Sequence, residues 1–309
     1  MKGVKLMKKI GISAFIIVVL AFIVFCGYLY IKPRYFDKGI EINKDNFPDD
    51  NLREFAMKRD KRNDGNGYLS TYEIETLHTI ELEGCENLKG IENFIAVNII
   101  KLTSCNDISA INALENLTTI ELKDCKNIDV DLCNYTSLKK LVIDSCELKY
   151  DIDFNGMESL QEISIDESTV GKICISNCPE LKKGIFYRSK LEEISISDCP
   201  KFEYYEVHNN TNLKKHTIEN CPKIWRVSLC GCSEINSLEV NECEKLYEID
   251  VLRNDSLTEV TVKGCPVIDE ALNDTDNLEK YIAKDGIIYL DHENSTSISY
   301  TGDVKFITE

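Results

Sequence analysis

The segment LTTIELKDCKNI, residues 117–128, carries the pattern that decides the fold: apolar residues and one cysteine in the order L-x-x-I-x-L-x-x-C-x-x-I. The pattern returns every 20 to 22 residues between Leu77 and Leu290. Cut at one phase, it gives ten units that cover 214 of the 309 residues: 77–97, 98–117, 118–138, 139–160, 161–181, 182–202, 203–224, 225–246, 247–268 and 269–290. Units this short cannot bury an apolar face alone, so we expect an elongated solenoid of stacked coils.

Each unit contains one strand with alternating sides. In unit 118–138 we expect Ile120 and Leu122 to point inward and Glu121 and Lys123 to face solvent. The pattern matches the strand segment of a leucine-rich repeat, L-x-x-L-x-L-x-x-N/C-x-L. At its turn stands a series of small residues, here called the first ladder: Cys85, Cys105, Cys125, Cys146, Ser168, Ser189, Asn210, Cys232 and Asn254. We predict that these side chains stack in one column.

A second ladder begins in the C-terminal half and consists of Cys178, Cys199, Cys221, Cys243 and Cys265. The two ladders then alternate at a spacing of 11 residues, which predicts a strand on both sides of each later coil. The fold class is therefore mainly β, with the later coils flattened between two sheets. Ten of the fourteen cysteines lie on the ladders. We expect free buried thiols there, with a disulfide network as the alternative.

The N-terminal segment is typical of a membrane anchor. Residues 1–9 contain four lysines and no acid, and residues 10–31 form an uncharged, largely apolar run. A helix of about 20 apolar residues crosses a hydrocarbon core of ~30 Å. We predict a cytoplasmic tail (1–9), a transmembrane signal anchor (10–31) and an extracellular C-terminal part. The localisation would be the cell membrane with a single pass. A cleaved signal peptide is the competing interpretation.

Residues 32–76 are expected to form a linker and a helical cap. Asn46-Phe47-Pro48 leads into a predicted helix, and residues 62–73 follow the template of an EF-hand calcium loop. The candidate metal ligands are Asp64, Asn66, Tyr68, Ser70 and Glu73. Position 1 of the template holds Arg62, a cation that repels Ca²⁺. Ser70 and Glu73 also fit a capping box, so a purely structural loop is the alternative to a calcium site. We expect no other cofactor.

Several segments of the chain resemble known surface proteins. Residues 42–49, 52–53, 64–70 and 88–92 are similar to the N-terminal cap of leucine-rich-repeat surface proteins of Gram-positive gut bacteria, a group that is similar to internalins. Residues 281–289 resemble the closing hairpin of bacterial surface-antigen leucine-rich repeats, and 291–309 would form a C-terminal cap. The resemblance implies a place on the cell surface and a role in adhesion or host-surface interaction.

The sequence shows few signs of catalysis. Its four histidines lack metal-ligand spacing, and it has neither a phosphate-binding glycine loop nor a nucleophile elbow. We therefore predict that the chain is not an enzyme. With 53 acidic against 36 basic residues, nucleic acid is an unsuitable partner. The outward acids Glu81, Glu83, Glu121 and Asp144 are read as a solvated face, and a catalytic carboxylate pair is the alternative.

One surface differs from the rest. Outward positions of the later coils carry aromatic side chains and an arginine, the residue types that dominate binding hot spots: Tyr187, Tyr204, His208, Trp225 and Arg226. We predict a membrane-anchored extracellular binding protein, adhesion-like, that holds a protein or glycan on this sheet face. The alternatives are a polysaccharide-degrading enzyme on a β-solenoid and a purely structural envelope protein.

Overall fold

The computed structural model describes residues 22–24, 39–61, 65–126 and 128–266, together with the backbone of 287–289, 297–300 and 305–307. Within these ranges no helix is long and apolar enough to cross a membrane. The expected tail 1–9 and all but three residues of the expected anchor 10–31 lie outside the described residues. The membrane segment therefore stays a prediction.

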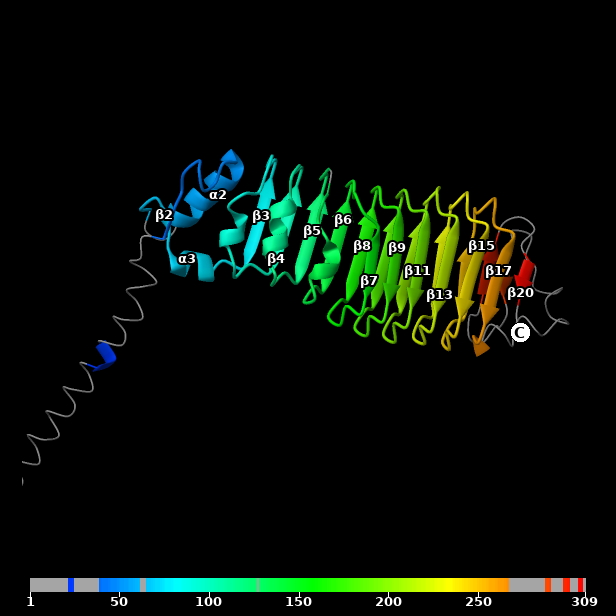
Figure 1. Ribbon diagram of the computed structural model, residues 1–309. Helices are drawn as coiled ribbons and strands as arrows, with labels where there is room; N and C mark the ends of the chain where they lie inside the picture. Colours follow the sequence, from blue (N-terminus) through cyan, green and yellow to red (C-terminus); the bar gives the residue numbers. More distant parts are fainter. Residues whose placement is uncertain are drawn as a thin grey trace, which may run out of the picture.

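A small cap covers the first coil (Figure 1). It contains β1 (Ile40–Glu41), α2 (Asp50–Lys61), β2 (Tyr68–Leu69) and α3 (Thr71–Glu75), and β1 pairs antiparallel with β2. Asp49 begins α2, because its Oδ1 accepts hydrogen bonds from the backbone N–H groups of Asn51 and Leu52. Its Oδ2 accepts another from Glu86 N at 2.8 Å. Asp49 thus ties the cap to the solenoid, whose apolar end the cap shields from water.

The solenoid begins with a parallel sheet that receives one strand from every coil. These strands are β3 (Thr79–Glu83), β4 (Ile99–Thr103), β5 (Thr119–Lys123), β6 (Lys140–Asp144), β8 (Glu162–Asp166), β10 (Lys183–Tyr187), β12 (Tyr204–His208), β14 (Arg226–Cys230) and β16 (Glu248–Val251). Equivalent positions pair throughout, for example Ile80 with Ile100 and Ile100 with Ile120. The nine coils confirm the predicted mainly β solenoid. The tenth predicted unit, 269–290, lies outside the described residues apart from 287–289.

The opposite side changes character along the chain. The first three coils carry short 3₁₀ helices there, η1 (Ile91–Asn93), η2 (Ser109–Ala113) and η3 (Leu132–Asn134). From the fourth coil on, a second parallel sheet replaces them, with strands β7 (Ile152–Asn155), β9 (Lys172–Ser176), β11 (Glu193–Ser197), β13 (Lys215–Glu219), β15 (Ser237–Asn241) and β17 (Glu259–Lys263). The predicted two-sheet arrangement is therefore confirmed. It begins one coil before the second ladder, because the buried Met157 stands after β7 where later coils have cysteine.

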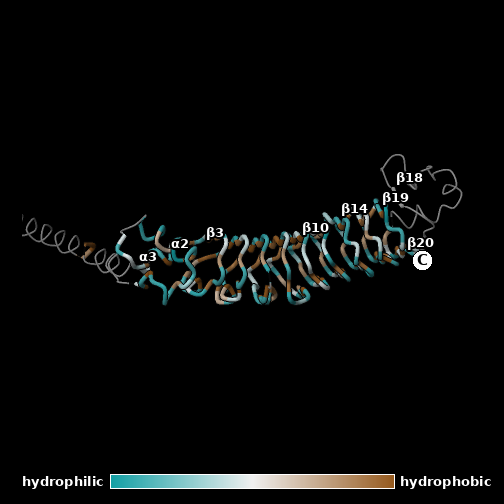
Figure 2. Tube along the Cα trace, turned by 90° about the horizontal axis from the view of Figure 1, so that it is seen from above, coloured by the Kyte–Doolittle hydropathy of each residue, from teal (hydrophilic) through white to brown (hydrophobic). Residues whose placement is uncertain are grey.

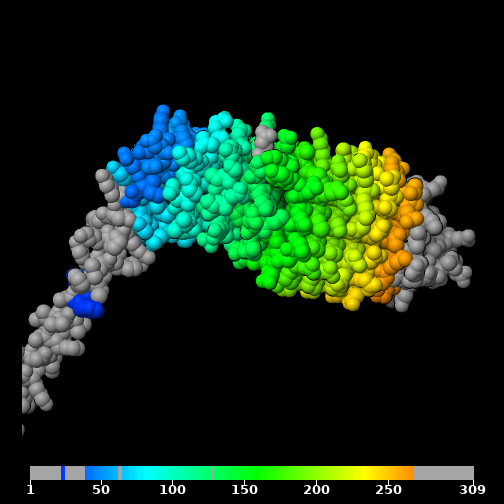
Figure 3. Space-filling view, in the orientation of Figure 1, coloured from blue at the N-terminus to red at the C-terminus, as the bar shows by residue number. Residues whose placement is uncertain are grey.

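Apolar side chains fill the space between the two sides. The alternation predicted for unit 118–138 is confirmed, since Ile120 and Leu122 are buried and Lys123 is exposed. The coils form one continuous body from the cap to β17 (Figure 3). The solenoid bends gently, with the first sheet on the inner side of the bend (Figure 2). A concave sheet of this kind offers an extended, rigid surface.

Both ladders are buried columns, as predicted. Each residue that precedes a ladder position has a left-handed backbone, for example Asp124 with φ 51° and Asn220 with φ 50°. The ladder side chain then donates back to the carbonyl two residues earlier, as the Cys146 thiol does to Asp144 O. It also accepts from the preceding coil, as the Ser168 hydroxyl does from Cys146 N at 3.0 Å. Every cysteine within the described ranges is a free thiol.

Both sheets continue beyond the described side chains. β19 (Ser297–Tyr300) pairs parallel with β16, and β20 (Lys305–Ile307) pairs parallel with β17. β18 (Ile287–Tyr289) pairs antiparallel with β19. Part of the segment 291–309, expected as a C-terminal cap, therefore adds one strand to each sheet.

Candidate ligand-binding face

The predicted binding residues come together on the outer side of the first sheet, over β10, β12 and β14. In this article the candidate face is the group Tyr187, Tyr204, Glu206, His208, Trp225 and Arg226. Parallel pairing sets Lys183 beside Tyr204, and Tyr187 beside His208. It sets Glu206 beside Ser228 on the next strand. Residues about 21 positions apart thereby become neighbours on a rigid sheet.

Tyr187 and His208 form the centre of the face. Their rings stack with centroids 5.1 Å apart and planes 14° apart. The Tyr187 hydroxyl donates a hydrogen bond to the Glu206 carboxylate. Burial lifts the pKa of Glu206, but hydrogen bonds from Tyr187 and Tyr204 outweigh it and hold that pKa below its usual range. Glu206 is therefore an anionic acceptor that fixes both phenols.

Arg226 is held in place by two carboxylates of the next coil. Its Nε lies 2.9 Å from Glu248 Oε1, and its Nη2 lies 3.2 Å from Asp250 Oδ2. The guanidinium charge is thus balanced before any ligand arrives. Trp225 stands immediately before β14 and stacks on Tyr247, with centroids 5.5 Å apart. Trp225 therefore lies at the edge of the sheet, half-buried, and its ring faces a neighbouring coil.

The same sheet face carries a different surface over the early coils. Lys101 lies 3.1 Å from Glu81 and 3.8 Å from Glu121, and Lys140 lies 2.9 Å from Glu121. Alternating charges from successive coils thus neutralise one another along the sheet. Exposed ion pairs of this kind contribute little to stability. They show that the outward acids Glu81 and Glu121 are solvated partners of lysines.

Five carboxylates of the described ranges have a pKa that is shifted toward the charged form. A catalytic acid needs a raised pKa, which burial or a second carboxylate supplies. Within the described ranges, each carboxylate whose pKa clearly departs from its ordinary value has it lowered: Asp49, Glu54, Asp129, Glu180 and Glu206. These carboxylates are suited to holding charge, not to donating a proton.

One contact on the face has the geometry of a nucleophile and its base. His208 Nε2 lies 2.9 Å from the Ser228 hydroxyl, a distance typical of such pairs. Ser228, however, has 0% exposure. A substrate cannot reach that hydroxyl, so the contact serves to orient the His208 ring.

The candidate calcium loop is closed by its own side chains. Glu73 Oε2 accepts hydrogen bonds from the backbone N–H and the hydroxyl of Ser70, which confirms the capping box. Asn66 Oδ1 accepts from Tyr68 N. Asp60, buried below the loop, accepts from the N–H groups of Asn66 and Gly67, both at 3.0 Å. Asp64 lies outside the described residues. Over the described part, no three acidic, histidine or cysteine groups lie close enough to hold a metal.

Three of the partners that were not among the predicted site residues stand one repeat away from one of them: Lys183, Tyr247 and Glu248. Lys183 places its ammonium 5.7 Å from the centre of the Tyr204 ring. All three stand 21 or 22 residues from a predicted site residue. Including the residue one repeat before or after each predicted site residue would have identified them.

Comparison with known proteins finds only distant structural likenesses. No family model matches the chain, and no curated protein matches it. Similar solved structures include internalin C2 of Listeria monocytogenes, which is 15% identical with a TM-score of 0.40 and is matched over 74% of this chain and 90% of its own. Internalin InlF of the same species is also 15% identical, with a TM-score of 0.35 and coverage of 70% and 92%. InlJ, described as including a cysteine ladder, is 12% identical, with a TM-score of 0.28 and coverage of 75% and 80%. At these identities and TM-scores, the likeness to internalins says nothing about a ligand.

Proposed function

We propose that this chain is a membrane-anchored extracellular binding protein that holds a protein ligand, in an adhesion-like role, on the candidate face. The observation that carries the proposal is the fixed arrangement of Tyr187, Tyr204 and Arg226 over one patch of a rigid sheet. Aromatic and arginine side chains dominate the energetics of protein interfaces. Because hydrogen bonds and ion pairs already hold these side chains, little conformational entropy is lost on binding.

The ring arrangement favours a protein over a glycan. A sugar ring binds by stacking on an open aromatic face. Here the rings of Tyr187 and His208 cover each other, and Trp225 is covered by Tyr247 on one side. Lys183 lies 5.7 Å from the centre of the Tyr204 ring, so each aromatic ring of the face already has a neighbour. The phenol hydroxyls and the paired arginine add directional polar groups, which suit a polypeptide surface.

Binding is tested with the purified full chain in mild detergent, against immobilised extracellular-matrix proteins and a glycan array. The decisive variant replaces Tyr187, Tyr204 and Trp225 with serine. The matched control replaces Lys101, Glu121 and Lys140 with serine on the same sheet. We expect saturable binding to a protein that the first variant loses about a hundredfold and the control keeps, which is the scale of two or three hot-spot residues.

Each other outcome rejects part of the proposal. Binding that survives in the first variant places the site elsewhere. Binding to glycans alone rejects the protein ligand. No binding at all favours the purely structural envelope role.

The membrane anchor rests on residues 1–31 alone and has its own test. Expression of the full chain and of a form lacking residues 1–31 is followed by separation of membranes from soluble protein. We expect the full chain in the membrane fraction, resistant to high salt and accessible to protease from outside. Equal partitioning of the two forms would reject the anchor.

A further inference from the structure

A carboxylate and two phenols form the polar centre of the candidate face. Glu206 lies on the outer side of β12, Tyr204 stands two residues before it, and Tyr187 lies on the neighbouring strand β10. The Tyr187 hydroxyl donates a hydrogen bond to Glu206 Oε2. Tyr204 also forms a side-chain hydrogen bond with Glu206. These three side chains are called the acceptor cluster below.

Both phenols direct their only hydrogen at Glu206. The hydrogen bond to Glu206 is the main cause that raises the pKa of Tyr204, and burial followed by the same carboxylate raises the pKa of Tyr187. The two phenols therefore stay protonated at neutral pH. A phenol that donates its hydrogen keeps the lone pairs of its oxygen, and a carboxylate has about four acceptor positions. The acceptor cluster thus has only lone pairs left to offer a ligand.

The charge of Glu206 is not neutralised by an ion pair with any described residue. The cations on the neighbouring strands pair with other carboxylates, since Lys183 lies 3.2 Å from Glu162 and Arg226 lies 2.9 Å from Glu248. Of the interactions that lower the pKa of Glu206, the one with Arg226 is the smallest. Glu206 therefore remains an anion that neutral donors hold in place.

The strands around the acceptor cluster carry an excess of negative charge. The outward positions of β8, β10, β12, β14 and β16 hold five acids and two bases: Glu162, Asp166, Glu206, Glu248 and Asp250, with Lys183 and Arg226. The outward positions of β3 to β6 are closer to balance, with four acids and three lysines. A positively charged group is therefore complementary to the half of the sheet that carries the candidate face.

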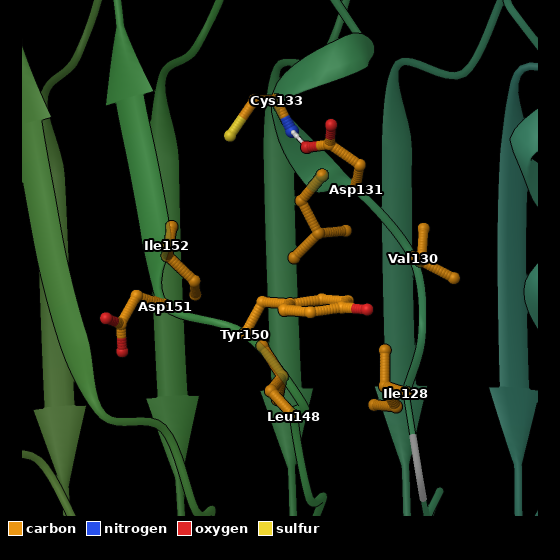
Figure 4. Close-up of a pocket in the computed structure, with 9 residues that line it drawn as sticks. Ile128, Val130, Asp131, Cys133, Leu148, Tyr150, Asp151 and Ile152 are labelled. Atoms are coloured by element: carbon orange, nitrogen blue, oxygen red, sulfur yellow. Dashed lines mark hydrogen bonds between the residues drawn. The ribbon is translucent and has the colours of Figure 1, made fainter.

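A pocket of about 340 Å³ between the third and fourth coils has a different chemistry (Figure 4). Much of its lining is hydrocarbon, as at Ile128 and Val130. Asp151 turns its carboxylate away from the pocket, and its Oδ1 accepts a hydrogen bond from Lys172 N at 2.8 Å. The acceptor cluster, by contrast, lies on the outer side of the sheet, where a ligand can reach its unused lone pairs.

We propose that the acceptor cluster binds an arginine side chain of the protein ligand. This inference rests on the proposed function, because it names the contact by which such a ligand is selected. A guanidinium is planar, always charged and carries five N–H donors and no acceptor. It donates to the Glu206 carboxylate and to the oxygens of Tyr187 and Tyr204. A carboxylate or a carbonyl of the ligand would instead bring acceptors against acceptors, and an ammonium lacks the planar fork.

Calorimetry on the full chain in mild detergent tests the proposal with three capped peptides. They share one glycine-serine sequence with two variable positions, which hold arginine, lysine or citrulline. Citrulline has the shape of arginine without its charge. We expect saturable binding of the arginine peptide, about threefold weaker binding of the lysine peptide and at least about tenfold weaker binding of the citrulline peptide. Equal affinity of the three peptides, or no binding of the arginine peptide, would overturn the proposal.

Matched variants separate a specific contact from the general attraction of an acidic protein. Glu206→Gln keeps the size of the side chain and should weaken the arginine peptide about tenfold. The control Glu121→Gln removes one charge from the same sheet over the early coils and should change the affinity less than about twofold. Tyr187→Phe keeps the ring but removes one acceptor and should cost about threefold. Circular dichroism checks that each variant is folded. Equal losses for Glu206→Gln and Glu121→Gln would overturn the proposal.

The assay with matrix proteins distinguishes a failure of this inference from a failure of the proposed function. We expect Glu206→Gln to weaken the protein ligand about tenfold, and the arginine peptide to compete with it. A protein ligand that the triple serine variant loses, but that Glu206→Gln and the peptide leave unaffected, would overturn the arginine contact and keep the proposed function. If no matrix protein binds while the arginine peptide still depends on Glu206, the arginine selectivity stands and the proposed ligand class fails.

Discussion

The Tyr205 hydroxyl donates a 2.7 Å hydrogen bond to His216 Nε2 and so joins the two sheets through the core. Tyr205 belongs to β12 and His216 to β13, and both side chains are buried. The Nδ1 atom of His216 lies 3.0 Å from Ile194 O, a carbonyl that can only accept, so Nδ1 carries the proton. Nε2 is then the acceptor. The pair is a fully satisfied polar bridge between apolar layers.

This bridge predicts a loss of stability in mild acid. Burial lowers the pKa of the His216 imidazole to about 4, against the smaller raising effect of its bond to Ile194 O. In the unfolded chain the pKa returns to about 6.5. Above that value the group has no effect on stability. As pH falls below this value, His216 binds a proton in the unfolded chain but stays neutral in the folded protein. The free energy of unfolding therefore falls by about 2 kcal/mol at pH 5.

The matched variant for this prediction is the double change Tyr205→Phe with His216→Leu, which removes both polar partners together. Urea unfolding at pH 7 and pH 5 should show a pH effect smaller by about 2 kcal/mol than in the unaltered chain. His78→Gln, at an exposed histidine, should keep the full effect. An unchanged pH effect in the double variant would contradict the assignment of the proton uptake to His216.

The hydrogen bonds of the first ladder predict that alanine at position 210 destabilises the protein more than serine does. Its Oδ1 accepts from Ser189 N at 2.8 Å, and its Nδ2 donates to Phe186 O at 2.7 Å. Asn210→Ala leaves two buried backbone groups without partners and should cost about 2–4 kcal/mol of unfolding free energy. Asn210→Ser should lose only part of this, because serine makes the ladder contacts at Ser168. Equal losses for alanine and serine would show that the volume of the ladder side chain, and not its hydrogen bonds, determines its contribution to stability.

The left-handed turns predict a stabilising glycine. Glu242 precedes Cys243 with φ 52°, a conformation that costs a residue with a Cβ about 1 kcal/mol or more. Glu242→Gly should raise the free energy of unfolding by about 0.5–1 kcal/mol. The comparison is Glu239→Gly within β15, which should destabilise by about 1 kcal/mol. Destabilisation at both positions would mean that the Glu242 side chain stabilises the turn.

The cap loop predicts stability without metal. The Glu73 carboxylate is used in the capping box, and Asp60 accepts the loop N–H groups. We expect millimolar Ca²⁺ to leave the melting temperature unchanged. Asp60→Asn should lower stability by about 1–2 kcal/mol, because one loop N–H loses its acceptor. A calcium-dependent rise in melting temperature that Asp64→Asn abolishes would instead establish the metal site.

Periodic features could be predicted from the sequence, and single irregular ones could not. The alternation around Ile120 and the columns through Cys125 and Cys199 follow from the repeat, because every coil repeats the same geometry. The second sheet began earlier than predicted, since Met157 breaks the cysteine pattern without breaking the coil. A methionine at a ladder position has no signature of its own, and only its burial reveals the role.

The sequence by itself determined the solenoid, the ladders and the placing of Tyr187, Tyr204 and Arg226 on one sheet, because parallel stacking converts a fixed period directly into neighbourhood in space. Tertiary structure alone decided which groups satisfy one another: Glu206 with the two tyrosines, His216 with Tyr205, and Asp60 with the cap loop. It also decided that a pocket of about 340 Å³ opens between the third and fourth coils. These contacts depend on side-chain direction and on distances of a few ångström, and a period of 20 to 22 residues does not encode either.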